Sequence, residues 1–289
     1  MPEASAVRDA FGYVGLGDMG SAMVGALIDH NVDCLVYDLS PSAVAPLVER
    51  GAVAATDSAC LARRCRVVSV CVPADEDVRA VLDGPDGVLA NLEPGSTVAL
   101  HSTVLPTTVR WAGEAAAERG VHFVEAPVTG GREAVAAGTL TFLLVGDTAA
   151  IDAIEPLLRA CGEQRIFLDR LGDANQLKLC INLNSYASFV AAGEATRLAR
   201  ELGLDPARLH TAMEANGQVS PLLRNVLPLQ LWDDALVGDD GMQRILASRV
   251  GIMRKDMNVL QRVVADADLR APLLALVAEE LSATFRQSA

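Results

Sequence analysis

Short apolar runs alternate with helix-like stretches through the first half of the chain. The runs predict β-strands near residues 11–16, 33–38, 51–54, 66–72, 96–100, 121–125 and 140–145. Segments in which apolar residues recur at helical spacing separate these runs. This alternation is typical of the α/β class, in which a doubly wound and mostly parallel sheet carries helices on both faces.

The pattern changes near residue 172, where strand-like runs give way to long segments rich in Ala, Leu, Glu and Arg. The spacing predicts one long helix over 172–202 that ends near Gly203. Asp205 and Pro206 would start the next helix, since Pro favours the first helical position. The sequence therefore predicts a sheet domain over 1–171, an interdomain helix over 172–203 and an all-helical C-terminal domain over 204–289.

A glycine-rich turn follows the first predicted strand. Gly15, Gly17 and Gly20 form the pattern G-x-G-x-x-G, and a helix-like stretch follows over 21–29. The first glycine would permit a tight turn, the second a close approach to a pyrophosphate, and the third close packing of helix on strand. A merely structural turn is the alternative, but the flanking strand and helix favour a Rossmann-type dinucleotide-binding turn.

The second predicted strand ends on Asp38, about 20 residues beyond the glycines. A carboxylate at that distance would accept hydrogen bonds from the adenosine ribose hydroxyls. Residues 39–42 include no Arg or Lys that could bind a 2′-phosphate. We therefore expect NAD as the cofactor and NADP less readily. The alternative for Asp38 is the solvated end of a strand.

The strand 66–72 ends at Pro73, and loops at such strand ends form the ligand crevice of open α/β sheets. The expected cofactor-binding residues of the sheet domain are Gly15, Leu16, Gly17, Asp18, Met19, Gly20, Asp38, Val72 and Pro73.

Composition narrows the class of protein. A net charge of −13 argues against nucleic acid or an anionic membrane as a partner. No uninterrupted apolar run is long enough to cross a bilayer. Residues 1–9 lack the basic start and apolar stretch of a secretory signal, so a cytoplasmic location is the default expectation. An anionic substrate would need a local basic site, for which the candidates are Arg132, Lys178, Arg254 and Lys255.

Cysteines and histidines add no metal chemistry. The six cysteines show no C-x-x-C spacing, and several fall in apolar strand or helix patterns, where most would pack as small hydrophobes. The four histidines are scattered without metal-binding spacing, so we expect no metal site.

Lys178 and Asn182 lie four residues apart in the predicted long helix, so one helix face would carry an ammonium and an amide. That pair could act on a hydroxyl or a carbonyl. A lysine can exchange its proton near neutral pH only if burial or a neighbouring cation lowers its pKa. The neighbours of Lys178 are mostly apolar; the alternative is an ordinary solvated lysine.

These motifs together resemble the β-hydroxyacid dehydrogenase family, which includes 3-hydroxyisobutyrate dehydrogenases and tartronate semialdehyde reductases. The resemblance covers nearly the whole chain. It is carried by the segments 101–106 (H-S-T-V-L-P), 123–131 (F-V-E-A-P-V-T-G-G), 137–141 (A-G-T-L-T), 172–182 with its lysine and asparagine, and 255–257 (K-D-M).

The resemblance implies a role for each motif. Lys178 would be the catalytic acid/base, and Asn182 would help to place the substrate. Thr103 would border the nicotinamide. The substrate carboxylate would bind at a turn whose glycines expose backbone N–H groups, formed by Thr129, Gly130 and Gly131. From the helical domain, Lys255 would contact the cofactor and Asp256 the substrate.

Simpler interpretations stay open for several of these residues. The Gly-Gly turn could be an ordinary loop, and Thr103 could act only as a helix N-cap. Asn182 could be a packing-neutral helix amide. Lys255 and Asp256 could form a local surface ion pair. His101 could suggest an acid/base, but we expect it to be only a neighbour of the cleft.

Three residues depart from the family pattern. Leu100 stands where relatives commonly have Asp, Thr129 where Ser is commoner, and Ser248 where some relatives have a large aromatic residue. These departures leave the reaction type intact but make the identity of the substrate an open question.

The sequence thus predicts an oxidoreductase that transfers a hydride between NAD and a small 3-hydroxy acid, interconverting it with its semialdehyde or ketone. An imine reductase-like enzyme and a non-catalytic NAD-binding sensor or scaffold are the alternatives. Lys178 argues against an imine reductase, because those enzymes replace the catalytic lysine. The presence of both Lys178 and the Gly-Gly turn argues against a non-catalytic protein. The apolar helical C-terminal half suggests a homodimer or homotetramer.

Overall fold

The computed structural model describes residues 10–231 and 239–285. The chain divides into two compact units, Met1–Lys178 and Leu179–Ala289, with the division inside a helix. The three-part division expected from the sequence stays a prediction, and the N-terminal stretch 1–9 lies outside the described residues. No helix in the described part of the chain is long and apolar enough to cross a membrane.

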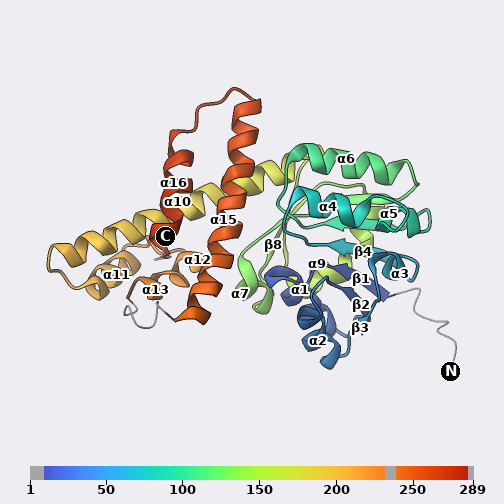
Figure 1. Cartoon of the computed structure of the whole chain (residues 1–289), viewed down its shortest axis with the longest axis horizontal. Coiled ribbons are helices and arrows are strands. Elements are labelled where there is room, and N and C mark those ends of the chain that lie inside the picture. The colour runs from blue at the N-terminus through green and yellow to red at the C-terminus, as the bar shows by residue number, and fades with distance from the viewer. Residues whose placement is uncertain (1–9, 232–238, 286–289) are drawn as a thin grey trace. The chain divides into compact units, whose positions relative to one another are not determined.

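The first unit is built on a six-stranded sheet in the order β3-β2-β1-β4-β5-β6 (Figure 1). Each neighbouring pair runs parallel. The strand order reverses between β1 and β4, and ligands bind at such switch points in open α/β sheets. The strands are β1 Ala10–Val14, β2 Cys34–Tyr37, β3 Val53–Ala54, β4 Cys65–Val70, β5 Thr97–Leu100 and β6 His122–Glu125. The predicted fold class is confirmed.

In the strands other than β3, whose two residues are exposed, alternating residues enter two different cores, one on each face of the sheet. Phe11 and Tyr13 of β1 pack in the first core, whereas Ala10 and Val14 pack in the second. Helices α1, α7, α8 and α9 contribute to the first core, and α3, α4, α5 and α6 to the second. Because both faces are buried there, most residues of β1, β2, β4 and β5 are apolar, which makes these strands recognisable in the sequence.

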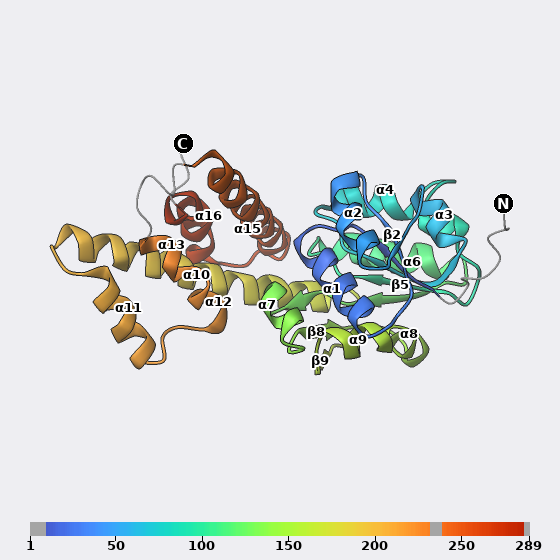
Figure 2. The same ribbon diagram turned by 90° about the horizontal axis from the view of Figure 1, so that it is seen from below.

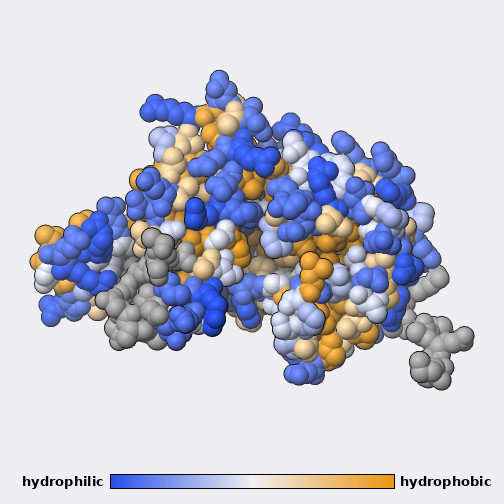
Figure 3. Space-filling model, in the orientation of Figure 1, coloured by the Kyte–Doolittle hydropathy of each residue, from blue (hydrophilic) through white to orange (hydrophobic). Residues whose placement is uncertain are grey.

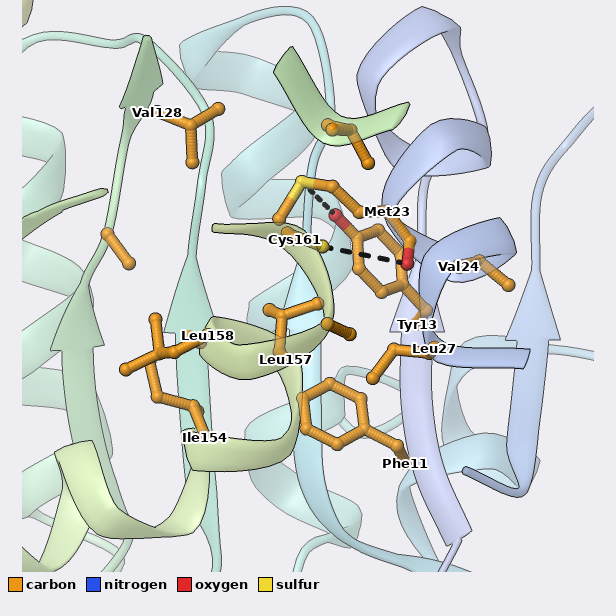
Figure 4. Packing of buried hydrophobic residues seen from close by; sticks show 14 of the residues in the cluster. Phe11, Tyr13, Met23, Val24, Leu27, Val128, Ile154, Leu157, Leu158 and Cys161 are labelled. Carbon is orange, nitrogen blue, oxygen red and sulfur yellow. Dashed lines mark hydrogen bonds between the residues drawn. The ribbon is translucent and has the colours of Figure 1, made fainter. Parts of the chain in front are cut away.

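The helices of the first unit are α1 Asp18–Asp29, α2 Pro41–Glu49, α3 Ser58–Ala62, α4 Asp75–Leu82, α5 Val88–Asn91, α6 Pro106–Ala117, α7 Gly131–Ala136, α8 Thr148–Ala153 and α9 Glu155–Cys161. Figure 4 shows the first core, where side chains of α1 and α9 meet those of β1. The Tyr13 hydroxyl lies 3.3 Å from the Met23 sulfur, so even this buried phenol has a partner.

A second, three-stranded sheet was not predicted. It has the order β7-β8-β9, formed by Val128–Thr129, Thr141–Leu144 and Gln164–Phe167. The run predicted at 140–145 is the central strand of this sheet rather than a strand of the large one. The other two were missed because β7 has only two residues and the Gln164–Phe167 strand is mostly exposed and partly polar. Figure 2 shows this sheet with α8 and α9 on one side of the large sheet.

The predicted long helix exists as α10, Asp173–Glu201, and the C-terminal part is helical as predicted. The Asp205 carboxylate accepts a 2.9 Å hydrogen bond from Ala207 N at the start of the next helix, as its N-cap position requires. The described helices of the second unit after α10 are α11 Pro206–Ala215, α12 Pro221–Arg224, α13 Leu227–Leu231, α15 Asp240–Asp266 and α16 Pro272–Thr284.

Candidate cofactor site and catalytic helix

The glycine-rich turn joins β1 to α1 at the carboxyl edge of the large sheet. Gly15 has φ +90°, and a Cβ on it would lie 2.3 Å from the Cys71 carbonyl oxygen. A Cβ on Gly20 would lie 2.0 Å from the Gly15 carbonyl oxygen. Both positions therefore require glycine. A Cβ on Gly17 would meet no atom of the described chain within 4 Å, so this part of the turn is open for a ligand to approach.

Helix α1 begins immediately after the turn, with Gly17 as its N-cap. Glycine has no side chain that could accept a hydrogen bond from the first-turn N–H groups, which leaves them available to an anion. Asp18 is the first helical residue, and Met19 behind it is half-buried. A glycine-rich turn that opens a helix in this way is typical of pyrophosphate-binding sites.

Asp38 is joined directly to this turn. Its Oδ2 accepts a 2.7 Å hydrogen bond from Leu16 N, and its Oδ1 accepts one of 2.7 Å from Ser40 N. The carboxylate is thereby held at the end of β2, half-buried, with lone pairs left for ribose hydroxyls. This contact joins residues that are 22 positions apart in the sequence.

A hollow of about 690 Å³ lies beside Asp38, between α2 and the end of β3. Its wall is mostly apolar, and Leu39 next to it is 88% exposed. The apolar surface over α2 and β3 is visible in Figure 3. The lining residues are Tyr37, Asp38, Leu39, Pro41, Val44, Ala45, Val48, Glu49, Ala54, Ala55 and Thr56.

The loops after β4 and β5 meet at the same edge of the sheet. Val72 N donates a 2.9 Å hydrogen bond to Ser102 Oγ, which ties the loop that contains Pro73 to the loop that contains Thr103. Val72 and Thr103 are half-buried, and Pro73 is exposed. The predicted cofactor residues of the first unit therefore lie at four neighbouring strand ends, those of β2, β1, β4 and β5.

A buried carboxylate that the sequence analysis missed fixes the start of α10. The side chain of Glu125, at the end of β6, accepts hydrogen bonds from Gly172 N at 2.7 Å and from Asn175 N at 2.6 Å. Asn175 Nδ2 donates to it as well, at 3.0 Å, while Asn175 Oδ1 accepts from Val104 N at 2.9 Å. Burial raises the pKa of Glu125, and these hydrogen bonds oppose the rise.

The acidic residue Glu125 at the end of a buried strand is the one signal of this network in the sequence. The sequence does not indicate which groups Glu125 binds. The network holds the first turn of α10 above the ends of β5 and β6. Lys178 follows Asn175 by three residues on the same helix and is half-buried. Leu179 next to it is fully buried and Cys180 is exposed. The position of the lysine backbone is thus set by the large sheet.

The predicted carboxylate-binding turn leads from β7 into α7. Gly130 and Gly131 have φ of +129° and +75°, a conformation that favours glycine. Thr129 and Gly131 are half-buried and Gly130 is exposed. The next residue, Arg132, forms an ion pair with Asp18 at 3.0 Å, so this turn and the glycine-rich turn are linked within the first unit.

The remaining predicted site residues belong to the second unit, where the carboxylate of Asp256 contacts three side chains. Asp256 Oδ2 accepts hydrogen bonds from Asn182 Nδ2 at 2.8 Å and from the Tyr186 hydroxyl at 2.9 Å. Its Oδ1 lies 2.6 Å from Lys255 Nζ, an ion pair without hydrogen-bond geometry. Burial and the neighbouring carboxylate raise the pKa of Tyr186 well above its usual value. Asn182 and Asp256, predicted separately, are thus in direct contact.

His101 is a core residue of the first unit. Its Nδ1 lies 2.8 Å from the Ala126 carbonyl oxygen and its Nε2 lies 2.9 Å from Ser69 Oγ. Because a carbonyl can only accept, the proton sits on Nδ1 and Nε2 accepts from the serine. The ring stacks on Tyr13, and burial lowers its pKa to about 4. This neutral histidine joins β4 and β5 to the segment after β6.

The departures from the family pattern lie in different environments. Leu100 is fully buried in the second core, where it packs as an apolar residue. Ser248 is exposed on α15. Of the cysteines, Cys34, Cys65 and Cys161 are buried, Cys60 and Cys71 are half-buried and Cys180 is exposed. Within residues 10–231 and 239–285, no cluster of three or more His, Cys, Asp or Glu side chains could hold a metal ion.

Comparison with known proteins agrees with this arrangement. The family model of the NAD binding domain of 6-phosphogluconate dehydrogenase matches residues 10–172. The model described as NAD-binding of NADP-dependent 3-hydroxyisobutyrate dehydrogenase matches residues 172–289. The two matches meet at the start of α10.

Individual relatives cover most of the chain. An uncharacterized oxidoreductase of Mycobacterium tuberculosis is 30% identical over 278 residues, which cover 94% of this chain and 92% of the relative. The NAD-dependent L-serine dehydrogenase of Pseudomonas aeruginosa is 36% identical over 193 residues, covering 67% of this chain and 65% of the relative. The structure of Psf3 in complex with NADP+ and 2-OPP is 28% identical, with a TM-score of 0.83 over 95% of this chain and 93% of that chain.

The fold and the glycine-rich turn define a dinucleotide-binding oxidoreductase with a Rossmann-type first unit and a helical second part. The chain belongs to the β-hydroxyacid dehydrogenase family, the NAD(P)-dependent group of 6-phosphogluconate and 3-hydroxyisobutyrate dehydrogenases.

Proposed function

We propose that this protein oxidises a small 3-hydroxy acid to its semialdehyde or ketone with NAD, or catalyses the reverse reduction, with Lys178 as the acid/base. The observation that carries the proposal is the anchoring of α10. Glu125 and Asn175 hold the helix that bears Lys178 at the same sheet edge as the glycine-rich turn. The start of the helix that bears Lys178, the proposed proton-transfer group, is therefore anchored at this edge of the sheet.

The residues present fit a dinucleotide. Gly17 leaves the turn open, Gly15 and Gly20 admit no side chain, and the Asp38 carboxylate lies beside an apolar hollow. A bound NAD would accept a hydride at C4 of its nicotinamide. The first turn of α1 would bind its pyrophosphate, Asp38 its adenosine ribose, and Val72, Pro73 and Thr103 would line the nicotinamide half.

The chain's own groups would perform the acid–base chemistry. In oxidation, Nζ of neutral Lys178 takes the proton of the substrate hydroxyl as the carbon loses its hydride. In reduction, the ammonium polarises the carbonyl and then donates that proton. The backbone N–H groups of the Thr129, Gly130 and Gly131 turn bind the substrate carboxylate. The Asn182 amide, oriented by Asp256, completes the orientation of the substrate.

We propose NAD rather than NADP as the preferred cofactor. The Asp38 carboxylate would repel a 2′-phosphate, and residues 39–42 supply no basic side chain. The NAD-dependent L-serine dehydrogenase supports this assignment by name, whereas Psf3 was solved with NADP+. L-Serine is itself a small 3-hydroxy acid, which supports the proposed substrate class.

We also propose that the chain assembles as a homodimer or homotetramer through its second unit. Several large apolar side chains there are about half exposed, namely Ile245, Ile252, Leu273 and Leu276. Burying them against a second copy would remove apolar surface from water. Light scattering that gives one species of 30.4 kDa, the mass of a single chain, would contradict this assembly.

The reaction is tested by following NADH absorbance with NAD or NADP and a panel of small 3-hydroxy acids. Each acid is paired with the matching alcohol that lacks the carboxylate. We expect turnover with acids and not with their matched alcohols, and faster turnover with NAD. Tight NADH binding without turnover of any acid in the panel would contradict the proposed reaction and favour a sensor.

A further inference from the structure

An ion pair connects two turns of the first unit. One is the glycine-rich turn, the proposed site of the cofactor pyrophosphate, and the other is the Gly-Gly turn, the proposed site of the substrate carboxylate. Arg132 Nη1 lies 3.0 Å from Asp18 Oδ1. Asp18 is the first residue of α1, directly after the glycine-rich turn, and Arg132 is the residue after Gly131. The two residues are 114 positions apart in the sequence, so only the fold brings them together.

The placement of Asp18 creates an electrostatic problem for a dinucleotide. A carboxylate in the first turn stabilises a helix through its dipole, but it also puts a negative charge where a pyrophosphate would bind. The protein as a whole also carries a net charge of −13, which has the same sign as Asp18. Arg132 is the group that neutralises it in this structure.

The pair of Arg132 and Asp18 is expected to contribute little to the stability of the fold. The side chains of Arg132 and Asp18 are 54% and 53% exposed. Exposed ion pairs of this kind contribute little to stability. Exposure to solvent is, however, compatible with a role in ligand binding.

We propose that Arg132 is a charge-compensating residue of the cofactor site. Its guanidinium, held by Asp18, offsets the carboxylate at the start of α1 and so permits tight binding of the cofactor pyrophosphate. The inference rests on the proposed function, because it requires a dinucleotide at this turn. It predicts that the affinity for NADH rises as the summed charge of the two side chains becomes more positive.

The experiment measures the dissociation constant of NADH at low and high salt for the full-length protein and four variants. Arg132→Gln leaves a net negative charge and should weaken binding about tenfold at low ionic strength. Asp18→Asn leaves a net positive charge and should tighten binding. The double variant restores neutrality and should bind like the original protein, and Arg132→Lys should do so as well. The differences should shrink at high salt.

The chain offers a matched control at the other end of α1. Arg50 pairs with Asp29 at 2.8 Å, with side chains 46% and 66% exposed. Asp29 lies about 16 Å from Asp18 along the helix, at about 1.5 Å per residue. Arg50→Gln should therefore leave NADH affinity unchanged.

Three results would overturn the inference. If Arg132→Gln binds NADH as the original protein does, the pair is a surface contact only. If Arg132→Gln and Asp18→Asn both weaken binding equally, the pair is a structural link and not a charge compensation. If the original protein binds neither NADH nor NADPH, the proposed function itself fails, which is a distinguishable result.

Discussion

Asn182 Nδ2 donates a 2.8 Å hydrogen bond to Oδ2 of Asp256, a residue that is only 3% exposed. Tyr186 donates to the same oxygen. The carboxylate that resemblance would assign to the substrate is therefore occupied by its neighbours. The Asp256 carboxylate can orient the Asn182 amide, because its hydrogen bond to Nδ2 fixes the direction in which the amide oxygen points.

Asp256→Ala should lower kcat/KM by about tenfold or more, because it removes the oxygen that accepts from both Asn182 Nδ2 and the Tyr186 hydroxyl, and a buried donor left unsatisfied costs about 1–3 kcal/mol. Tyr186→Phe is the matched control, since it removes one donor to Asp256 and leaves Asn182 bonded. We expect the control to retain most of the activity. Steady-state kinetics of both variants measure the difference. Equal activity in Asp256→Ala and the original protein would refute a positioning role for Asp256.

Asp38→Asn should reduce the preference for NAD over NADP, since it removes the negative charge that would repel a 2′-phosphate. We expect the ratio of kcat/KM values to fall on the order of tenfold, the effect of one lost charge at short range. Asp33→Asn is the control, because Asp33 is an exposed acid just before the opposite end of the same strand. An unchanged ratio in Asp38→Asn would remove the argument for NAD.

Glu125→Gln should destabilise the first unit by about 1–3 kcal/mol, because an amide has one acceptor oxygen where the carboxylate has two. Glu125 accepts from two different backbone N–H groups, those of Gly172 and Asn175. We also expect kcat to fall more than NADH affinity, since the helix that bears Lys178 loses its anchor. A variant that loses stability but keeps its kcat would show that the network only supports the fold.

His101 should make the protein less stable in mild acid. Its pKa in the folded state is about 4, below the ordinary 6.5 of the unfolded chain. The unfolded state therefore takes up a proton first as the pH falls, and stability is lost between pH 6.5 and about 4. At about 1.4 kcal/mol per pH unit, this residue accounts for a loss of about 3 kcal/mol.

The measurement is the free energy of unfolding at several pH values for the original protein and His101→Asn. Asparagine can still donate to the Ala126 carbonyl but does not titrate. The difference between the two proteins should change with pH in the stated window. A constant difference would contradict the neutral buried histidine.

The parts of this protein that sequence predicted depend on local pattern. The central strands of the large sheet are mostly apolar because both faces are buried, and the glycine-rich turn has its signature within ten residues, from Phe11 to Gly20. Asp205 likewise caps the helix that immediately follows it. Such features need no knowledge of distant partners.

The parts that sequence did not predict depend on distant contacts. Glu125 and Asn175 are separated by 50 residues, and Asn182 and Asp256 by 74. Arg132 carries no mark in the sequence of its pairing with Asp18. The short strand Val128–Thr129 exists only because it pairs with Phe142 and Thr141 in another part of the chain. These relationships follow from the register of the fold, which a single sequence does not contain.

The central claim is that Lys178 moves the substrate proton, and one paired measurement tests it most directly. Turnover and NADH affinity are measured for Lys178→Ala and for Gln176→Ala, an exposed residue on the same helix. We predict that Lys178→Ala lowers kcat by about 10²- to 10⁴-fold, the usual contribution of a general acid/base, with NADH affinity nearly unchanged. Gln176→Ala should remain fully active. Equal turnover by the two variants would contradict the account.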